Sequence, residues 1–417
     1  MSYTLLKGSF VIRYPDLPQQ GPEPDGDTVK FRPDSPALVE TLPRFSGRAP
    51  DLGARGVSVR LEAIDALETH FGEVRQELAG AEGARNVLLA TLGFTNVEFF
   101  PDQPNKVRSA DQDTVRGHVL SNGVDANGRL VGFVYAGDAG PVDGAVLFLE
   151  TPQLDQSVNA RLLAAGLAYP AFYATLPAEL RTHLAATSRA ARAASRGLWA
   201  RSTADPNAAA TVADLAALET LVIWPKLFRR LVPYLATGAT SFDGFDAWLR
   251  ADPVNRDDEV LLLSTVERSN LHDVVTAGGA QVQLTAWPED FVISPDPALP
   301  GVPTGPQHGV PGDVLIVAAL PNPLGTDRGH ESVTLLNVSS AAVALDGWAL
   351  VDTAGGRYEL SGTLAAGGVI QATLGGALAL GNTGDTITLV AAKGMTIDQV
   401  TYKADEVRPG RTITFGR

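Results

Sequence analysis

The sequence of 417 residues contains no cysteine, which excludes disulfide bonds, thiolate nucleophiles and zinc–thiolate sites. Long apolar stretches are also absent, and no segment approaches the roughly 18 consecutive apolar residues of a membrane-spanning helix. The first residues, Met1 to Ile12, lack the basic start and long apolar stretch of a signal peptide. We therefore expect no transmembrane segment. Three alternatives stay open for the location: the protein stays inside the cell, the sequence is a mature form, or export uses another route. Secretion or delivery by a non-classical route is favoured over a strictly cytoplasmic location.

A basic surface is lacking as well, because the net charge is −14. The first 200 residues hold 19 Lys and Arg against 23 Asp and Glu, so most of the excess negative charge lies beyond them. Proteins that bind nucleic acid tightly and without specificity normally use a basic surface, so only weak, metal-assisted binding of phosphate is expected here. The six histidines follow no metal-binding spacing.

Short alternating segments precede amphipathic ones in the first 200 residues, which is typical of the α+β class. The predicted strands cover residues 8–14, 28–31, 57–61, 97–100, 130–135 and 145–150, and the predicted helices cover residues 81–93, 155–165 and 177–196.

Composition divides the chain into four segments. Residues 1–202 form the first domain, and residues 203–293 form a mixed, mainly helical connecting region without a recognisable motif. Residues 294–312 are rich in proline and glycine and are predicted to be a linker. Residues 313–417 show short strands at intervals of about ten residues, the pattern of a small β-sandwich.

Charged side chains of complementary chemistry gather at three places in the first domain. Asp27 lies in an Asp-Gly-Asp-Thr turn. Arg60 lies in a predicted strand that Asp65 and Glu68 follow, and Arg129 precedes another strand. Carboxylate oxygens bind hard cations, guanidinium groups bind phosphate, and a further carboxylate can act as a base. Together these groups indicate a metal-dependent phosphodiesterase.

Each fragment has an ordinary structural explanation when taken alone. The Asp-Gly-Asp-Thr segment is a good turn sequence, and Asn127-Gly128 favours a hairpin that would leave Arg129 on the surface. Arg60 and Asp65 are five residues apart, so a regular strand would point them to opposite faces. Both can serve one site only if the strand ends or bulges between them.

The order of these fragments resembles the staphylococcal-type thermonuclease domain over about residues 8–200. The matching pieces are Asp25 to Val29, Val59 to Leu61, Asp65, Glu68-Thr69, Asp125 to Tyr135, Val158-Asn159, Gly166 to Ala168 and Gly197 to Trp199. This resemblance implies a five-stranded OB-fold β-barrel with helices, and a calcium-dependent endonuclease that cleaves DNA and RNA without regard to the sugar.

The same resemblance implies roles for individual residues. Asp27, Asp65 and the backbone carbonyl of Ala66 correspond to the ligands of Ca²⁺. Glu68 corresponds to the general base, and Arg60 and Arg129 correspond to the arginines that bind the phosphate. The tyrosines that flank the bound base fall near Phe172 and Tyr173, which makes these two a weaker substrate-binding pair.

The chain departs from the family pattern at several positions. The family's Thr-Pro pair is Ala66-Leu67 here, and its Lys-Tyr pair before the second arginine is Ala126-Asn127. These changes affect substrate affinity more than the chemistry. They leave open an alternative in which the protein is a catalytically weak or inactive scaffold that binds nucleic acid or protein.

The C-terminal segment resembles the lamin tail domain, an immunoglobulin-like sandwich. The matching pieces are Pro321 to Pro323, Glu331, Val333 to Leu335, Asn337, Leu345 to Trp348, Tyr358, Leu380 to Asn382, Gly384-Asp385 and Val400 to Tyr402. The resemblance implies a targeting or binding module with a protein or surface partner. Trp348 is expected in its core rather than at a ligand site.

Overall fold

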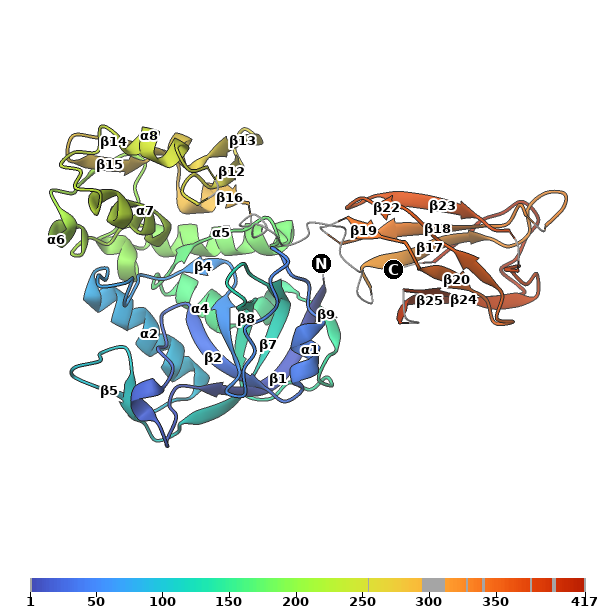
Figure 1. Ribbon diagram of the computed structural model, residues 1–417, viewed down its shortest axis with the longest axis horizontal. Coiled ribbons are helices and arrows are strands. Elements are labelled where there is room, and N and C mark those ends of the chain that lie inside the picture. The colour runs from blue at the N-terminus through green and yellow to red at the C-terminus, as the bar shows by residue number, and fades with distance from the viewer. Residues whose placement is uncertain are drawn as a thin grey trace. The chain divides into compact units, whose positions relative to one another are not determined.

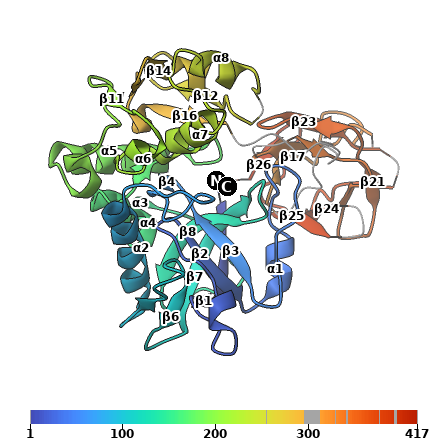
Figure 2. The same cartoon turned by 60° about the vertical axis from the view of Figure 1, so that its left-hand side comes forward.

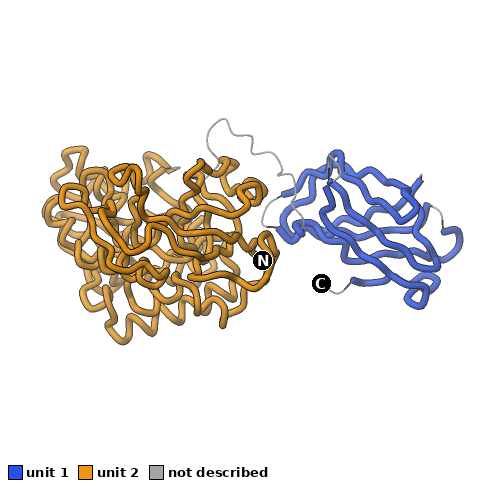
Figure 3. The backbone as a smooth tube through the Cα atoms, turned by 90° about the horizontal axis from the view of Figure 1, so that it is seen from below, with its two compact units in different colours: residues 1, 303–417 blue, residues 2–302 orange. Residues whose placement is uncertain are grey.

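The computed structural model describes residues 2–253, 255–294, 312–327, 329–339, 342–375, 377–391 and 395–415. The chain divides into two compact units, an N-terminal unit of residues 2–302 and a C-terminal unit of residues 303–417 (Figure 3). The linker predicted at residues 294–312 lies outside the described residues except at its two ends. Among the described residues, no helix is long and apolar enough to cross a membrane.

A closed five-stranded barrel forms the centre of the N-terminal unit (Figure 1). Its strands are β1 (Ser2–Val11), β2 (Thr28–Pro33), β3 (Val57–Leu61), β7 (Thr114–Val124) and β8 (Leu130–Ala136). The order β1-β2-β3-β8-β7 returns to β1, and β3–β8 is the parallel pair while the others are antiparallel. Closure of this kind removes the exposed sheet edges.

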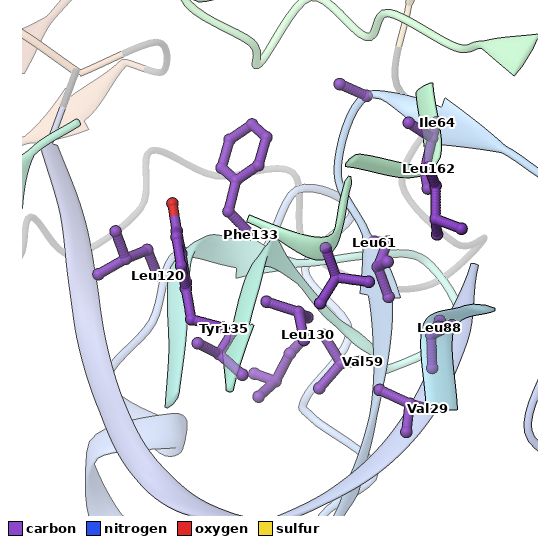
Figure 4. Packing of buried hydrophobic residues seen from close by; sticks show 14 of the residues in the cluster. Val29, Val59, Leu61, Ile64, Leu88, Leu120, Leu130, Phe133, Tyr135 and Leu162 are labelled. Carbon is purple, nitrogen blue, oxygen red and sulfur yellow. The ribbon is translucent and has the colours of Figure 1, made fainter. Parts of the chain in front are cut away.

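The barrel core is built from the inward-facing residues of these strands, together with two helices that cover it (Figure 4). Val29 on β2, Val59 on β3 and Leu130 on β8 are register neighbours in this core, which also contains Leu88 from α2 (Leu78–Leu92) and Leu162 from α4 (Val158–Ala164). Helix α2 begins at Glu77, whose carboxylate accepts from a backbone N–H, and it ends at Gly93 with a φ of 102°. Helix α2 is therefore held in place by the caps at its two ends and by packing on the barrel.

The remaining elements complete residues 2–202. They are β4 (Ile64–Asp65), β5 (Glu98–Phe99), β6 (Val107–Ser109), β9 (Val146–Phe148), β10 (Tyr169–Pro170), α1 (Pro36–Glu40), α3 (Thr151–Leu154), α5 (Ala178–Ala193), η1 (Pro18–Gln20) and η2 (Gly197–Ala200).

Residues 203–293 pack against the β4 end of the barrel, as both ribbon views show (Figures 1 and 2). Their elements are α6 (Leu215–Leu218), α7 (Pro225–Leu235), α8 (Phe245–Arg250), β11 (Ala210–Thr211), β12 (Glu259–Leu262), β13 (Glu267–Asn270), β14 (Val275–Gly278), β15 (Gln281–Leu284), β16 (Phe291–Ile293), η3 (Leu271–Asp273) and η4 (Pro288–Asp290). Two three-stranded sheets, β11-β15-β14 and β13-β12-β16, accompany the helices. The region is therefore mixed and not mainly helical, because its short apolar segments pair as strands.

The C-terminal unit is an all-β sandwich of two four-stranded sheets, β23-β18-β17-β26 and β21-β20-β24-β25, with a small β19-β22 pair. The strands are β17 (Val314–Leu320), β18 (Ser332–Asn337), β19 (Val343–Ala344), β20 (Ala349–Val351), β21 (Arg357–Glu359), β22 (Thr363–Leu364), β23 (Val369–Thr373), β24 (Gly384–Val390), β25 (Thr396–Lys403) and β26 (Ile413–Thr414). One core contains residues of both sheets, including Ile316 and Leu389. Trp348 is fully buried in it, so the prediction of a core residue is confirmed.

Candidate active site

A tight turn between β3 and β4 brings Arg60 and Asp65 together. Strand β3 ends at Leu61, and Ala63 then adopts a left-handed conformation with a φ of 70° that few non-glycine residues take. The buried Asn159 amide ties this turn to β8, because it donates to the backbone carbonyl of Glu62 at 2.9 Å and to that of Gly132 at 3.1 Å. The chain bends back, and Arg60 Nη2 lies 3.7 Å from Asp65 Oδ1. The strand does end between these residues, as a shared site requires.

Asp27 is held beside Ala66 by close backbone packing. A β-carbon at Gly26 would lie 2.5 Å from the β-carbon of Ala66 and 2.8 Å from that of Ala84, so only glycine fits between them. Asp27 Oδ2 accepts from the Ala66 backbone N–H at 3.4 Å, and Oδ1 accepts from the Thr28 hydroxyl at 2.9 Å. The structure therefore brings Asp27, Ala66 and Asp65 to one place.

Arg129 lies at the turn between β7 and β8, and Asp125 sets its position. The carboxylate of Asp125 accepts from Arg129 Nε and Nη2, both at 2.8 Å, and from the backbone N–H groups of Asn127 and Arg129 at 2.9 Å. Arg129 and Arg60 line one pocket, together with Asp125 and Tyr173. Both arginines thus line a single cavity, whose wall also carries the acidic residues Glu62 and Asp125.

The two aromatic candidates differ in their environment. Tyr173 lines the pocket, and the Arg60 guanidinium lies 5.5 Å from its ring centre. Phe172 is instead fully buried in the barrel core, so it is not placed to stack on a nucleotide base. Neighbouring residues of an extended segment point to opposite sides, and only Tyr173 faces outward.

An arginine from the connecting region enters the carboxylate cluster. Arg229, on α7, donates from Nη2 to both oxygens of Asp65, at 3.0 and 2.8 Å, and from Nη1 to Glu68 Oε1. No sequence pattern indicates this contact, because the partners are 164 and 161 residues apart and an arginine on a helix is ordinary. Among the described residues, no three carboxylate or histidine side chains form a group that could hold a metal ion.

The cluster shifts the pKa values of its carboxyl groups in opposite directions. Burial raises the pKa of Glu68 to about 7, with Asp27 and Asp65 adding to the rise and Arg229 opposing it. Burial also acts to raise the pKa of Asp65, but Arg229 and Arg60 outweigh it, and the net pKa is lowered. Asp65 is therefore held as a carboxylate, while Glu68 can take up a proton near neutral pH.

Glu62, a residue that sequence reasoning missed, lies at the wall of the same pocket as Arg60. Its side chain is buried, and its Oε2 has no hydrogen-bond partner among the described residues. Burial raises the pKa of Glu62 to about 7, although Asn122 and Arg60 favour the ionised form. A glutamate at a strand end looks like a surface residue in the sequence, so only the fold identifies it as buried.

Because the pKa of Glu62 is raised, the stability of the N-terminal unit is expected to fall as the pH rises. A carboxyl with a folded pKa of about 7 and an ordinary value of 4.5 stabilises the fold fully below about pH 4.5, and this contribution is lost as the pH rises through 7. Glu62→Gln is therefore expected to stabilise the unit at pH 8 by about 1–3 kcal/mol relative to its effect at pH 4.5.

Calorimetric unfolding at pH 4.5 and pH 8 tests this expectation, with Glu73→Gln, an exposed carboxyl of the same unit, as the control. Only the transition of the N-terminal unit should move. A difference between Glu62→Gln and the wild type that is the same at both pH values would contradict the assignment.

Comparison with known families agrees with both units. Residues 58–201 match the staphylococcal nuclease homologue family, and residues 307–404 match the lamin tail domain. The first match includes Arg60, Asp65, Glu68 and Arg129, whereas Asp27 lies before it and Arg229 after it. No curated protein matches the chain. The chain therefore carries a staphylococcal nuclease-like domain followed by a lamin tail domain.

Proposed function

We propose that the N-terminal unit is a calcium-dependent, sugar-non-specific endonuclease that hydrolyses the phosphodiester bonds of DNA and RNA. The observation that carries this proposal is the position of Arg60. Arg60 and Arg129 line the same pocket, and Arg60 also lies 3.7 Å from Asp65. Asp65 and Glu68 are close to each other, because Arg229 contacts both. The guanidinium groups that we propose for phosphate binding are thus close to the carboxylate that we propose as the base.

In this proposal the chain's own residues bind and orient the phosphodiester. Arg60 and Arg129 hold the non-bridging oxygens, where planar guanidinium groups offset the growing negative charge. Arg60 Nη2 is buried, makes no hydrogen bond with the described residues and lies 3.7 Å from Asp65 Oδ1, so this proposal gives it a phosphate oxygen as its hydrogen-bond partner. Glu68 accepts a proton from water as the water oxygen attacks phosphorus and the bond to the leaving oxygen breaks.

The carboxylates that this proposal assigns to a hard cation and to the base bind a positive group in the structure. Asp65 and Glu68 converge on one guanidinium, and Asp27 lies beside Ala66. Asp27, Asp65 and the Ala66 carbonyl would hold Ca²⁺, which prefers such oxygen ligands. When bound, calcium supplies a Lewis acid that stabilises charge on the phosphate.

A second candidate is a scaffold that binds nucleic acid or protein without cleaving it. The contact of Arg229 with both Asp65 and Glu68 favours this alternative, because these are the carboxylates that the chemistry needs. The lamin tail domain is proposed to act in either case as a targeting or binding module for a protein or surface partner. Delivery outside the cytoplasm by a non-classical route is proposed with it.

Digestion of single-stranded DNA and of RNA by the purified protein separates the two candidates. The measurement uses a calcium series up to saturation, magnesium alone and a chelator, with wild type and Arg129→Ala. The nuclease proposal predicts cleavage of both nucleic acids that requires calcium and is lost in Arg129→Ala. Binding of DNA without cleavage at any calcium concentration would favour the scaffold.

A further inference from the structure

The contact between Arg229 and the acidic cluster is extensive. The guanidinium makes a two-oxygen contact with Asp65 and a second contact with Glu68, from one side chain. Asp65 is almost fully buried, and Arg60 lies on its other side. Both oxygens of Asp65 are therefore engaged by a cation that belongs to the protein.

Helix α7, which carries Arg229, is fixed against the barrel. Trp224 and Phe228 are fully buried in a cluster that also contains Leu67, from the loop that follows Asp65. The buried Gln76 joins the two regions, because its Oε1 accepts from the Glu68 backbone N–H at 3.0 Å and its Nε2 donates to the Ile223 carbonyl at 2.8 Å. The helix thus presents Arg229 at a defined position.

The backbone at the barrel's edge adds a second attachment. The Ile293 N–H donates to the Phe172 carbonyl at 2.7 Å, and the Ala174 N–H donates to the Ile293 carbonyl at 3.0 Å. These bonds place residues 203–293 next to Tyr173 and the pocket. Removing Arg229 from the cluster therefore requires movement of its side chain and not of the whole region. That side chain is 19% exposed, which leaves it a path to solvent.

A guanidinium and a divalent cation compete for the same oxygens. Calcium needs lone pairs of Asp65 that point at it, and those lone pairs now accept hydrogen bonds from Arg229. The positive charges of Arg60 and Arg229 also repel a third cation at short range. Glu68 cannot deprotonate water freely while it accepts from Arg229.

We propose that Arg229 is a resident cation that competes with calcium for Asp65 while it also occupies Glu68, and so sets the metal requirement of the site. The effect of Arg229 on cleavage rests on the proposed function, whereas its competition with calcium concerns binding alone. Displacement of one side chain opens the metal position and frees the base at the same time. The site is consequently closed at low calcium and opens only as calcium replaces the guanidinium.

Calcium titration of the full chain by isothermal titration calorimetry tests the competition without reference to activity. Arg229→Met removes the charge and keeps an unbranched side chain that suits a helix. Arg229→Lys keeps the charge but loses the fork that spans two carboxylates. Arg250→Met, at an exposed arginine of α8 that pairs with Asp246, is the charge-matched control.

The expected result is a calcium Kd about tenfold to hundredfold lower in Arg229→Met than in the wild type, since calcium no longer has to break charged hydrogen bonds. Arg229→Lys should lie between the two, and Arg250→Met should match the wild type. Equal Kd values for wild type and Arg229→Met, or no calcium binding by either, would overturn the inference. If Arg229→Met unfolds, the Arg229→Lys comparison decides alone.

Nuclease activity measured on the same samples separates this inference from the proposed function. A lower Kd in Arg229→Met with no cleavage at saturating calcium supports the competition and contradicts the nuclease. Cleavage that is calcium-dependent in the wild type, with an unchanged Kd in Arg229→Met, supports the nuclease and contradicts the competition.

Discussion

Replacing Glu68 by glutamine is expected to lower the rate of calcium-dependent DNA cleavage by about 10²–10⁴-fold, the range that a general base contributes. Glutamine keeps the size of the side chain and an oxygen that can accept from Arg229, but it cannot take a proton from water. The backbone at residue 68 stays fixed by Gln76 in either protein. The loss should therefore appear in kcat, measured at saturating calcium, rather than in DNA affinity.

Initial rates on a single-stranded oligonucleotide at saturating calcium measure this effect. Glu73→Gln, an exposed glutamate close in sequence, is the matched control and should cleave at the wild-type rate. Activity of Glu68→Gln within threefold of wild type would show that Glu68 is not the general base.

Replacing Arg60 by methionine is expected to lower kcat/KM by about 10²–10³-fold, the usual loss for one donor to a charged transition state. Arg60 lies between Asp65 and the Tyr173 ring, and its Nη2 has no hydrogen-bond partner among the described residues. Arg229 remains on Asp65 in the variant, so the buried carboxylate keeps a partner and the fold should persist.

Arg60→Lys refines this prediction, because lysine keeps the charge without the planar fork and should recover only part of the activity. Arg108→Met, at an exposed arginine paired with Glu98, serves as the control. Full activity in Arg60→Lys would mean that charge alone is needed at this position. Full activity in Arg60→Met would contradict the phosphate role.

Much of the barrel could be predicted from local patterns, but its longest strand could not. Strands β2, β3 and β8 alternate or carry β-branched residues, and their predicted positions agree with the structure. Strand β7 contains Gly117 and Gly123, which hide its period. A β-carbon at Gly117 would lie 2.3 Å from the Phe10 ring, so the glycine is required by packing across the barrel and not by a turn.

For the site as well, contacts between residues close in the sequence could be predicted and contacts between distant residues could not. Asp65 and Glu68 follow one strand, so their proximity could be predicted from the sequence. Arg229 could not be predicted, because its place depends on how residues 203–293 pack on the barrel. Phe172 was expected near the substrate but is buried, since the one-residue alternation that separates it from Tyr173 depends on the tertiary fold.

The most direct test of the proposed nuclease first removes the Arg229 guanidinium and then also removes Glu68, the proposed general base. The measurement is the initial rate of single-stranded DNA hydrolysis at saturating calcium by Arg229→Met and by Arg229→Met combined with Glu68→Gln. A phosphodiesterase site predicts cleavage by the single variant and a loss of about 10²–10⁴-fold in the double variant. No cleavage by a folded Arg229→Met protein that binds calcium, or equal rates for both variants, would contradict a nuclease built on these residues.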